Sequence, residues 1–296
     1  MIDIDRDTIV IEREDYNFPK GLLDTPDCPL KLYALGNIEL LNHISIAIVG
    51  TRSSSEFGNE LAKNISKNLS NYNITIISGM ADGIDENSHI GTYNAGSTIA
   101  VVAGGFKTIL RGNKLKRAQE ILNHNGLIIS EYHPEFIVRK ALFLQRNRLI
   151  AGISSATVVI EAPIASGAIS TANHALRYKR PLYAIPWSLN HFKGEGCNLL
   201  FRQGAMPLID YKQLLIDLKI IPTQINFDSI ERTTKVKTIP NEYLKYYEFI
   251  EHNSPCLLEA IIDAFNEEFI GNVISTLTLM ELNNYIKSSD KGYYIS

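Results

Sequence analysis

Six short apolar runs, separated by segments of helical period, constrain the fold of this chain more than any other feature. The runs are rich in β-branched residues and polar residues rarely interrupt them, which predicts strands that are buried on both faces. Strands of this kind belong to a parallel sheet covered by helices. We therefore expect an α/β fold, a doubly wound and mostly parallel Rossmann-like sheet. The predicted strands are Ser45–Val49, Ile74–Ser78, Thr98–Ala103, Leu127–Ser130, Thr157–Glu161 and Pro181–Ile185.

The loops that leave these strands are rich in glycine, serine and threonine. In a doubly wound sheet, ligands bind outside the carboxyl ends of the strands, where loops lead into helices. The amino terminus of a helix offers free N–H groups, and glycine lets a phosphate approach the backbone closely. Each loop alone is equally well explained as a helix cap with a tight turn. Because several such loops share one edge, we predict that Gly50, Thr51, Arg52, Ser166 and Gly167 bind phosphate.

Positive charge gathers in the larger part of the chain. The formal net charge is −3, but residues 241–296 hold three lysines and nine acidic residues, so residues 1–240 carry +3. Two basic runs contain most of the relevant cations: Lys107, Arg111, Lys114, Lys116 and Arg117, then Arg139, Lys140, Arg146 and Arg148. Such runs are also common on solvated helix faces. Their position relative to the sheet has to decide whether they form a ligand site.

The second basic run is interleaved with an aromatic ring and an amide, within Phe143–Gly152. Cations that neutralise phosphates, together with a ring for stacking, are what single-stranded nucleic acid requires. On this segment alone, a buried Phe143 with arginines paired to Glu161 and other acids explains the residues as well. We predict a path for single-stranded DNA along Lys107, Arg111, Phe143, Arg146, Asn147 and Arg148.

Several other kinds of site are disfavoured. The first strand is not followed by Gly-x-Gly-x-x-Gly, and Gly-x-x-x-x-Gly-Lys-Ser/Thr does not occur. Asp85 and His89, four residues apart on a predicted helix, are interpreted with Asp82 as a capping aspartate and a packed histidine rather than a metal site. Cys28, Cys197 and Cys256 lie far apart, which indicates neither disulfides nor a zinc site. We expect no cofactor, no metal and no catalytic residue.

The amino terminus is acidic, and an apolar stretch long enough to span a membrane is missing from the sequence. We therefore expect a cytoplasmic protein without membrane contact.

The carboxy-terminal part has a different character. Residues 220–240 are polar, contain Pro222 and Pro240, and are predicted to be a linker. Three helical segments and two short strands then follow within 241–296, an order typical of a winged-helix-like domain. With residues 1–44 as an extension packed on the core and 45–219 as the Rossmann-like domain, the chain has two domains.

Taken in order, these segments resemble the DprA/Smf family of DNA-processing proteins. The motifs that carry the resemblance cover about residues 18–210 and include Phe18-Pro19, Leu22-Leu23-Asp24, Gly36-Asn37, Ile46–Arg52, Ser78–Asp85 with His89, Ser130-Glu131-Tyr132, Arg146–Gly152, Ser166-Gly167, Gly196-Cys197-Asn198 and Gly204-Ala205. The carboxy-terminal part matches more weakly.

The resemblance implies a protein that binds single-stranded DNA, forms a homodimer and helps to load a RecA recombinase during the uptake of transforming DNA. It implies no catalysis. The chain departs from the family pattern at three places: Asp82 replaces a basic residue, Leu110-Arg111 replaces a Tyr-Pro pair, and Trp187 replaces a glycine.

Two other classes of function stay open. A diverged paralogue could sense nucleotides or act in phage defence with the same phosphate loops. A phosphoribohydrolase of the same broad fold group would cleave nucleoside monophosphates, but those enzymes carry a glutamate in the phosphate loop. Here no acidic residue lies between Ser166 and Arg180, and Glu161 is the nearest carboxylate that we can name, with Arg146 or Arg148 expected to neutralise it.

Overall fold

A computed structural model describes residues 2–221, 239–266, 268–283, 285–289 and 292–295. It separates into two compact units, residues 1–223 and 224–296, and each is described by itself. The predicted linker 220–240 lies largely outside the described residues, apart from its first two and last two residues.

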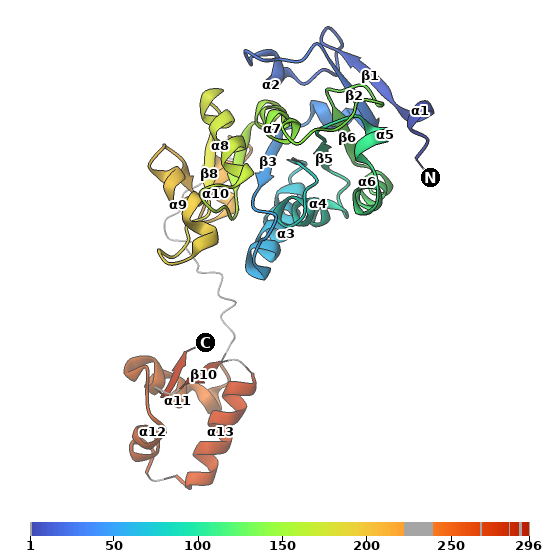
Figure 1. Ribbon diagram of the computed structural model, residues 1–296. Helices are drawn as coiled ribbons and strands as arrows, with labels where there is room; N and C mark the ends of the chain where they lie inside the picture. Colours follow the sequence, from blue (N-terminus) through green and yellow to red (C-terminus); the bar gives the residue numbers. More distant parts are fainter. Residues whose placement is uncertain (1, 222–238, 267, 284, 290–291, 296) are drawn as a thin grey trace. The chain divides into compact units, whose positions relative to one another are not determined.

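The first unit is built on a nine-stranded sheet (Figure 1) with the order β1-β2-β6-β5-β4-β3-β7-β8-β9. Seven strands run parallel to one another, and they are β3 (Ser45–Val49), β4 (Thr75–Ser78), β5 (Thr98–Val101), β6 (Leu127–Ser130), β7 (Ala156–Val159), β8 (Leu182–Ala184) and β9 (Met206–Pro207). The predicted α/β fold and its Rossmann-like, mostly parallel sheet are confirmed.

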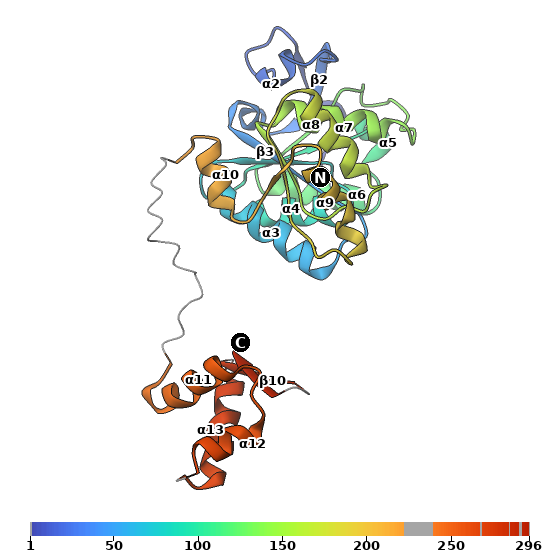
Figure 2. The same ribbon diagram turned by 90° about the vertical axis from the view of Figure 1, so that its left-hand side faces the viewer.

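Helices cover both faces of this sheet. In Figure 2, α7 (Leu142–Ile153) and α8 (Gly167–Arg177) lie above the strands, while α3 (Glu56–Ser70) and α4 (Ile84–Thr92) lie below them. The remaining helices of the unit are α1 (Ile4–Asp7), α2 (Lys20–Leu23), α5 (Phe106–Ile109), α6 (Asn113–Asn123), α9 (Glu195–Phe201) and α10 (Tyr211–Asp217), with 3-10 turns at Ile38–Asn42 and Phe192–Gly194.

Burial on both faces explains the unbroken apolar strands. Ile46 and Ile48 of β3 pack into one cluster with residues of α3, and Ala47 and Val49 pack into another with residues of α7 and α8. Ile46 and Ile48 are fully buried. Burying each such side chain stabilises the fold by roughly 1.5–3 kcal/mol.

Two strands that the sequence analysis did not predict extend the sheet at one edge. β1 (Ile9–Glu12) pairs antiparallel with β2 (Lys31–Gly36), and β2 pairs antiparallel with β6. β1 is a four-residue edge strand that buries only Ile11, whereas β2 buries four of its six residues. The amino-terminal segment is therefore part of the sheet.

The sheet contains one topological switch point. From β3 the chain moves outward through β4, β5 and β6, and it then returns to place β7 on the other side of β3. The loops after β3 and β7 therefore turn in opposite directions and leave a crevice between them.

The second unit contains three helices and a hairpin. They are α11 (Asn241–Asn253), α12 (Leu258–Ala264), α13 (Ile270–Leu282), β10 (Ile286–Ser289) and β11 (Gly292–Ile295), and the two strands pair antiparallel. Tyr246, Ile250, Ile261 and Leu277 are among the residues of a separate apolar core. The element order is the one predicted for a winged-helix-like domain.

Candidate functional site

A cavity of about 310 Å³ lies at the switch point. Gly50 follows β3 at its base, where a Cβ atom would lie 2.4 Å from Cγ1 of Ile84, so this position excludes larger residues. The cavity is lined by residues of four segments: Val49–Arg52, Ala81 with Asp85, Phe143 to Ile150 of α7, and Ser166 to Thr171 of α8. All five residues predicted to bind phosphate line it.

The first phosphate loop has a fixed backbone. Thr51 donates its N–H to the Glu161 carbonyl oxygen at 2.7 Å, and its own carbonyl oxygen accepts from the N–H of Ile84 at 3.3 Å. Gly83 has a φ of 78° and lies against this loop, where a Cβ atom would be 2.5 Å from the Thr51 carbonyl oxygen. Neighbouring loops therefore hold residues 50–52 in one conformation before any ligand binds.

The second phosphate loop is the start of α8. Ser166 is the N-cap, and its hydroxyl accepts from the N–H of Ala168 at 3.3 Å. The space around Gly167 is open, and no atom beyond its chain neighbours and its own helix backbone lies within 4 Å of an added Cβ. Asn147 donates from Nδ2 to the Gly167 carbonyl oxygen at 3.1 Å and so fixes the loop from α7. Ser166 is thus a helix cap, as one interpretation of the sequence had it, and also lines the cavity.

The N-cap of α3 is Ser55, whose hydroxyl accepts from the N–H of Gly58 at 3.0 Å. Arg52 lies three residues before this cap, in the loop itself.

Two cationic side chains lie over the Phe143 ring at the cavity wall. The Arg52 guanidinium lies 5.5 Å from the centre of the Phe143 ring, and the Lys114 ammonium lies 4.8 Å from it. Partial burial, with help from Arg146 and Arg52, holds the pKa of Lys114 below its usual value. Cations this close together, with a depressed ammonium pKa, favour the binding of an anion.

A second hollow of about 340 Å³ meets the first at this ring. The two hollows share Arg52, Phe143 and Arg146, and the second one adds Arg111 and Lys114. Arg117 also lines the second hollow, but Asp82 at 2.5 Å and Glu86 at 2.7 Å neutralise it. Lys114 belongs to the first basic run of the sequence but was not predicted as a site residue, because its spacing does not show that it reaches Phe143.

Arg146 connects the backbone of two neighbouring segments beneath the cavity. It is 4% exposed and donates from Nη1 to the carbonyl oxygens of Gly79, at 2.7 Å, and Val101. Asp85 accepts from the N–H of Gly79 at 3.1 Å beside it. Burial raises the pKa of Asp85 and lowers that of Arg146 to about 10, while each charge stabilises the other.

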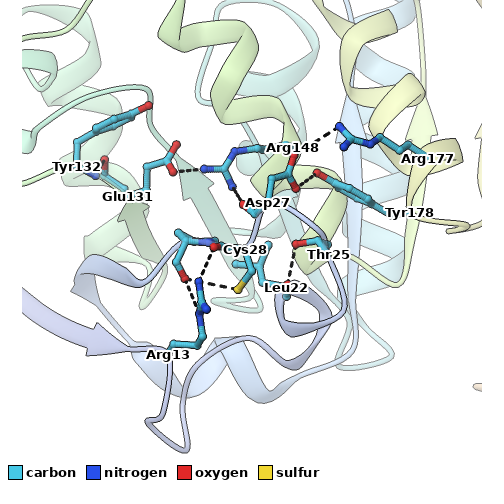
Figure 3. Close-up of polar contacts among 12 residues, drawn as sticks. Arg13, Leu22, Thr25, Asp27, Cys28, Glu131, Tyr132, Arg148, Arg177 and Tyr178 are labelled. Atoms are coloured by element: carbon cyan, nitrogen blue, oxygen red, sulfur yellow. Dashed lines mark hydrogen bonds and ion pairs between the residues drawn. The ribbon is translucent and has the colours of Figure 1, made fainter.

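Arg148 and Lys107 lie outside both hollows. Arg148 donates to the Asp27 carbonyl oxygen at 2.6 Å and pairs with Glu131 (Figure 3). Asp27 also accepts from the Tyr178 hydroxyl at 2.5 Å, so this network joins the amino-terminal segment to α7 and α8. Lys107 pairs with Asp5 at 2.5 Å and with Glu135 at 3.2 Å. These two residues of the predicted DNA path are engaged in ion pairs.

The expected neutralisation of Glu161 by Arg146 or Arg148 is wrong. Glu161 is fully buried; Oε2 accepts from the N–H of Ser55 at 2.7 Å, and Oε1 accepts from His191 at 2.9 Å. The charge of Arg146 is instead compensated by Asp85. Both Glu161 oxygens are therefore occupied by polar partners.

His89 is the packed histidine that the sequence indicated, but the predicted capping aspartate is wrong. The N-cap of α4 is Gly83, without a side-chain cap, and Asp85 instead accepts from the N–H groups of Gly79 and Ala81. His89 is buried and lies 2.7 Å from the Thr98 hydroxyl through Nδ1. Burial, with Arg117 and Arg146, lowers the pKa of His89 to about 3.

Across the described residues, His, Cys, Asp and Glu side chains form no cluster of three or more that could hold a metal ion. In that same part of the chain, no helix combines the length and apolarity of a membrane span.

Comparison with known proteins gives a consistent result. The family described as DNA recombination-mediator protein A matches residues 9–219. DNA processing protein DprA of Streptococcus pneumoniae is 32% identical over 203 residues, which cover 68% of this chain and 71% of that protein. DprA of Bacillus subtilis is 34% identical over 213 residues, 71% of each chain, and protein Smf of Synechocystis is 36% identical over 214 residues, 71% of this chain and 54% of the relative.

Solved structures show the same similarity. The crystal structure of Streptococcus pneumoniae DprA has a TM-score of 0.65 at 30% identity and covers 71% of this chain and 74% of that one. A Helicobacter pylori DprA structure, titled for its single-stranded DNA binding mode, has a TM-score of 0.63 at 32% identity and covers 72% of this chain and 95% of that one. With a matching family over most of the first unit and relatives above 30% identity, the chain belongs to the DprA/Smf family, the DNA recombination-mediator protein A proteins.

Proposed function

We propose that the chain binds the backbone of single-stranded DNA at the switch-point cavity and does not catalyse a reaction. The observation that carries this proposal is the position of Arg52, which lines both hollows, lies over the Phe143 ring and shares the first cavity with the open backbone at Gly167. A phosphate can be held by Arg52 and the start of α8, while a neighbouring base stacks against the ring.

The groups at the cavity favour binding without sequence preference. Arg52, Arg111 and Lys114 suit phosphates, and an aromatic ring accepts the face of any base. The Helicobacter pylori DprA structure, described for its single-stranded DNA binding mode, supports this choice of ligand. Homodimer formation and the loading of a RecA-type recombinase, which membership of the family suggests, belong to this proposal.

A phosphoribohydrolase is the alternative from the same fold group. It would need a carboxylate free to act at the ribose. Glu161 is buried and holds Ser55 and His191, and Asp85 faces Arg146, so neither carboxylate is free in the described structure. A binding role, including a role as a nucleotide sensor, fits these contacts better.

The test is a titration of a fluorescein-labelled oligothymidylate by fluorescence anisotropy with the whole chain. We expect affinity to fall steeply with salt, because bound phosphates release counterions. Arg52→Ala should weaken binding equally for different sequences and lower the salt slope. The matched control is Lys67→Ala, which removes an exposed cation from the last turn of α3. Equal affinity of wild type and Arg52→Ala contradicts the proposal, and tighter binding of a mononucleotide than of the oligonucleotide favours the sensor.

A further inference from the structure

A group of aromatic side chains surrounds Trp187, the single tryptophan of the chain. The His191 ring stacks on Trp187 with centroids 4.2 Å apart and planes inclined by 10°. Phe57, in the first turn of α3, meets the same indole edge-on at 5.7 Å. Phe192 follows His191 directly in the chain.

Trp187 is fixed from several sides. Its indole N–H donates to the Ile160 carbonyl oxygen at 2.8 Å, and its backbone exchanges two hydrogen bonds with the Asn198 side chain, at 3.1 and 2.9 Å. Gly194 lies against the ring, where an added Cβ would be 2.3 Å from Cγ. The indole is therefore a rigid support for the rings around it, at a position where the family pattern has glycine.

Two phenylalanine rings remain in solvent here, Phe57 in contact with the indole and Phe192 next to His191 in the chain. Phe57 is 64% exposed and Phe192 is 69% exposed, and His191 keeps part of its surface open. Exposed aromatic side chains that gather at one place mark a binding surface more often than scattered ones do.

One buried carboxylate joins this surface to the proposed phosphate site. Glu161 accepts from His191 with one oxygen and from the Ser55 N–H with the other, and its carbonyl oxygen accepts from the Thr51 N–H. Thr51 lines the cavity, and Ser55 caps the helix on which Phe57 stands. The aromatic group and the phosphate loop are thus held on the same short segment of backbone.

We propose that Phe57, His191 and Phe192, supported by Trp187, form a stacking surface for nucleobases of the strand whose backbone binds at the cavity. This inference rests on the proposed function. Glu56 precedes Phe57, and Glu195 lies close in the chain to Lys193, the one cation beside Phe192, so this surface has no excess of positive charge for phosphates. Base faces are the part of the strand that it accepts. A strand that leaves the cavity on this side places its bases on the rings.

The test compares two twelve-nucleotide probes, an oligothymidylate and the same strand with internal abasic tetrahydrofuran units. The variant Phe57→Ala with Phe192→Ala should bind the oligothymidylate at least about fivefold more weakly than wild type, because each stacked base contributes strongly to affinity. Its affinity for the abasic strand should equal that of wild type. Tyr16→Ala, which removes an 80% exposed ring from another loop, is the control and should bind both probes as wild type does.

Trp187 supplies an independent signal. Its emission should change saturably with the oligothymidylate and stay constant with the abasic strand. If the alanine pair unfolds at a lower temperature than wild type, Phe57→Leu with Phe192→Leu keeps the apolar volume and should show the same selective loss.

The outcomes separate the two proposals. If Arg52→Ala weakens binding but the ring variants bind both probes as wild type does, the stacking surface is overturned and the proposed function stands. An equal loss for both probes also overturns it, since the rings would then not act on bases. If wild type binds neither probe, the proposed function fails and the stacking surface with it.

Discussion

Arg52 and Phe143 come from separate elements that line the switch-point cavity, and the Arg52 guanidinium lies 5.5 Å from the Phe143 ring centre. The loop after β3 carries the arginine and α7 carries the ring. A cation over an aromatic face is held in place without an acidic partner, so its positive charge stays available to a ligand. This pair is the part of the site that a substitution can test most directly.

Removing the Phe143 ring should weaken binding of single-stranded DNA. Phe143→Ala takes away the stacking face and the support for Arg52 and Lys114, and we expect about a five- to tenfold loss of affinity. Phe143→Tyr, which keeps the ring, should bind nearly as wild type does. Anisotropy titrations at one fixed salt concentration measure both. Equal affinity of the alanine and tyrosine variants contradicts a role for the ring.

Arg146 should matter for stability more than for direct contact with DNA. Arg146→Met leaves the buried Asp85 without its compensating charge, a loss of about 3–5 kcal/mol in the free energy of unfolding. Adding Asp85→Asn removes that uncompensated charge and should restore part of the loss. Arg52→Met, at an exposed position, should change the unfolding free energy by less than about 0.5 kcal/mol. Urea unfolding followed by circular dichroism distinguishes the variants, and similar midpoints for Arg146→Met and Arg52→Met contradict the assignment.

His89 should make the protein less stable in mild acid. The Thr98 hydroxyl donates to the Ile76 carbonyl oxygen, so it accepts from the Nδ1–H of a neutral His89. The pKa of His89 is about 3 in the folded chain, below its ordinary 6.5, so below pH 6.5 the unfolded chain takes up a proton that the folded chain does not. Stability from this residue is therefore lost as pH falls from 6.5 towards 3, by about 1.4 kcal/mol per unit.

The measurement is the difference in unfolding free energy between pH 7 and pH 5, for wild type and for His89→Asn. Asp85, whose pKa is raised, acts in the opposite direction and is present in both proteins. We expect the variant to lose less stability on acidification than wild type, by about 2 kcal/mol. Parallel pH profiles would show that His89 is not the residue responsible.

The carboxy-terminal unit should contribute little to DNA affinity. Residues 241–296 hold nine acidic residues against three lysines, and this net negative charge repels phosphate. Protein contact is the role that we expect for this unit. A chain that ends at Pro240 should bind the oligothymidylate within about twofold of the full chain. Its thermal unfolding is recorded alongside. A truncated protein that stays folded and loses most of its affinity is the result that this prediction forbids.

The purified protein should release no free base from AMP, CMP, GMP or UMP. The buried Glu161 binds Ser55 and His191 with its two oxygens, so it is not placed to stabilise charge on a ribose. Chromatography of each nucleotide after incubation with the protein measures the reaction. Base release that disappears in Glu161→Gln would promote the phosphoribohydrolase.

The fold was predictable because strands buried on both faces leave unbroken apolar runs, and the cavity was predictable because ligands gather at the carboxyl ends of parallel strands. The arginines of α7 were harder to assign. Residues 146–153 of this helix are all buried, so no polar face shows which direction Arg146 and Arg148 take. Two residues apart on a helix, they point to different sides, and one meets Asp85 while the other meets Glu131. Spacing in the sequence alone cannot show which acidic partner each arginine meets.

The switch point also sets the order in which the strands of the sheet can pair while the chain is synthesised on the ribosome. While the chain extends only as far as β6, the strand β3 has β4 on one side and nothing on the other, because β7 has not yet been made. Until residue 159 has emerged, that side of β3 presents unpaired backbone groups, and Gly50–Arg52 has no opposing loop. A nascent chain of this length is exposed to wrong pairing and cannot yet hold a ligand at the crevice.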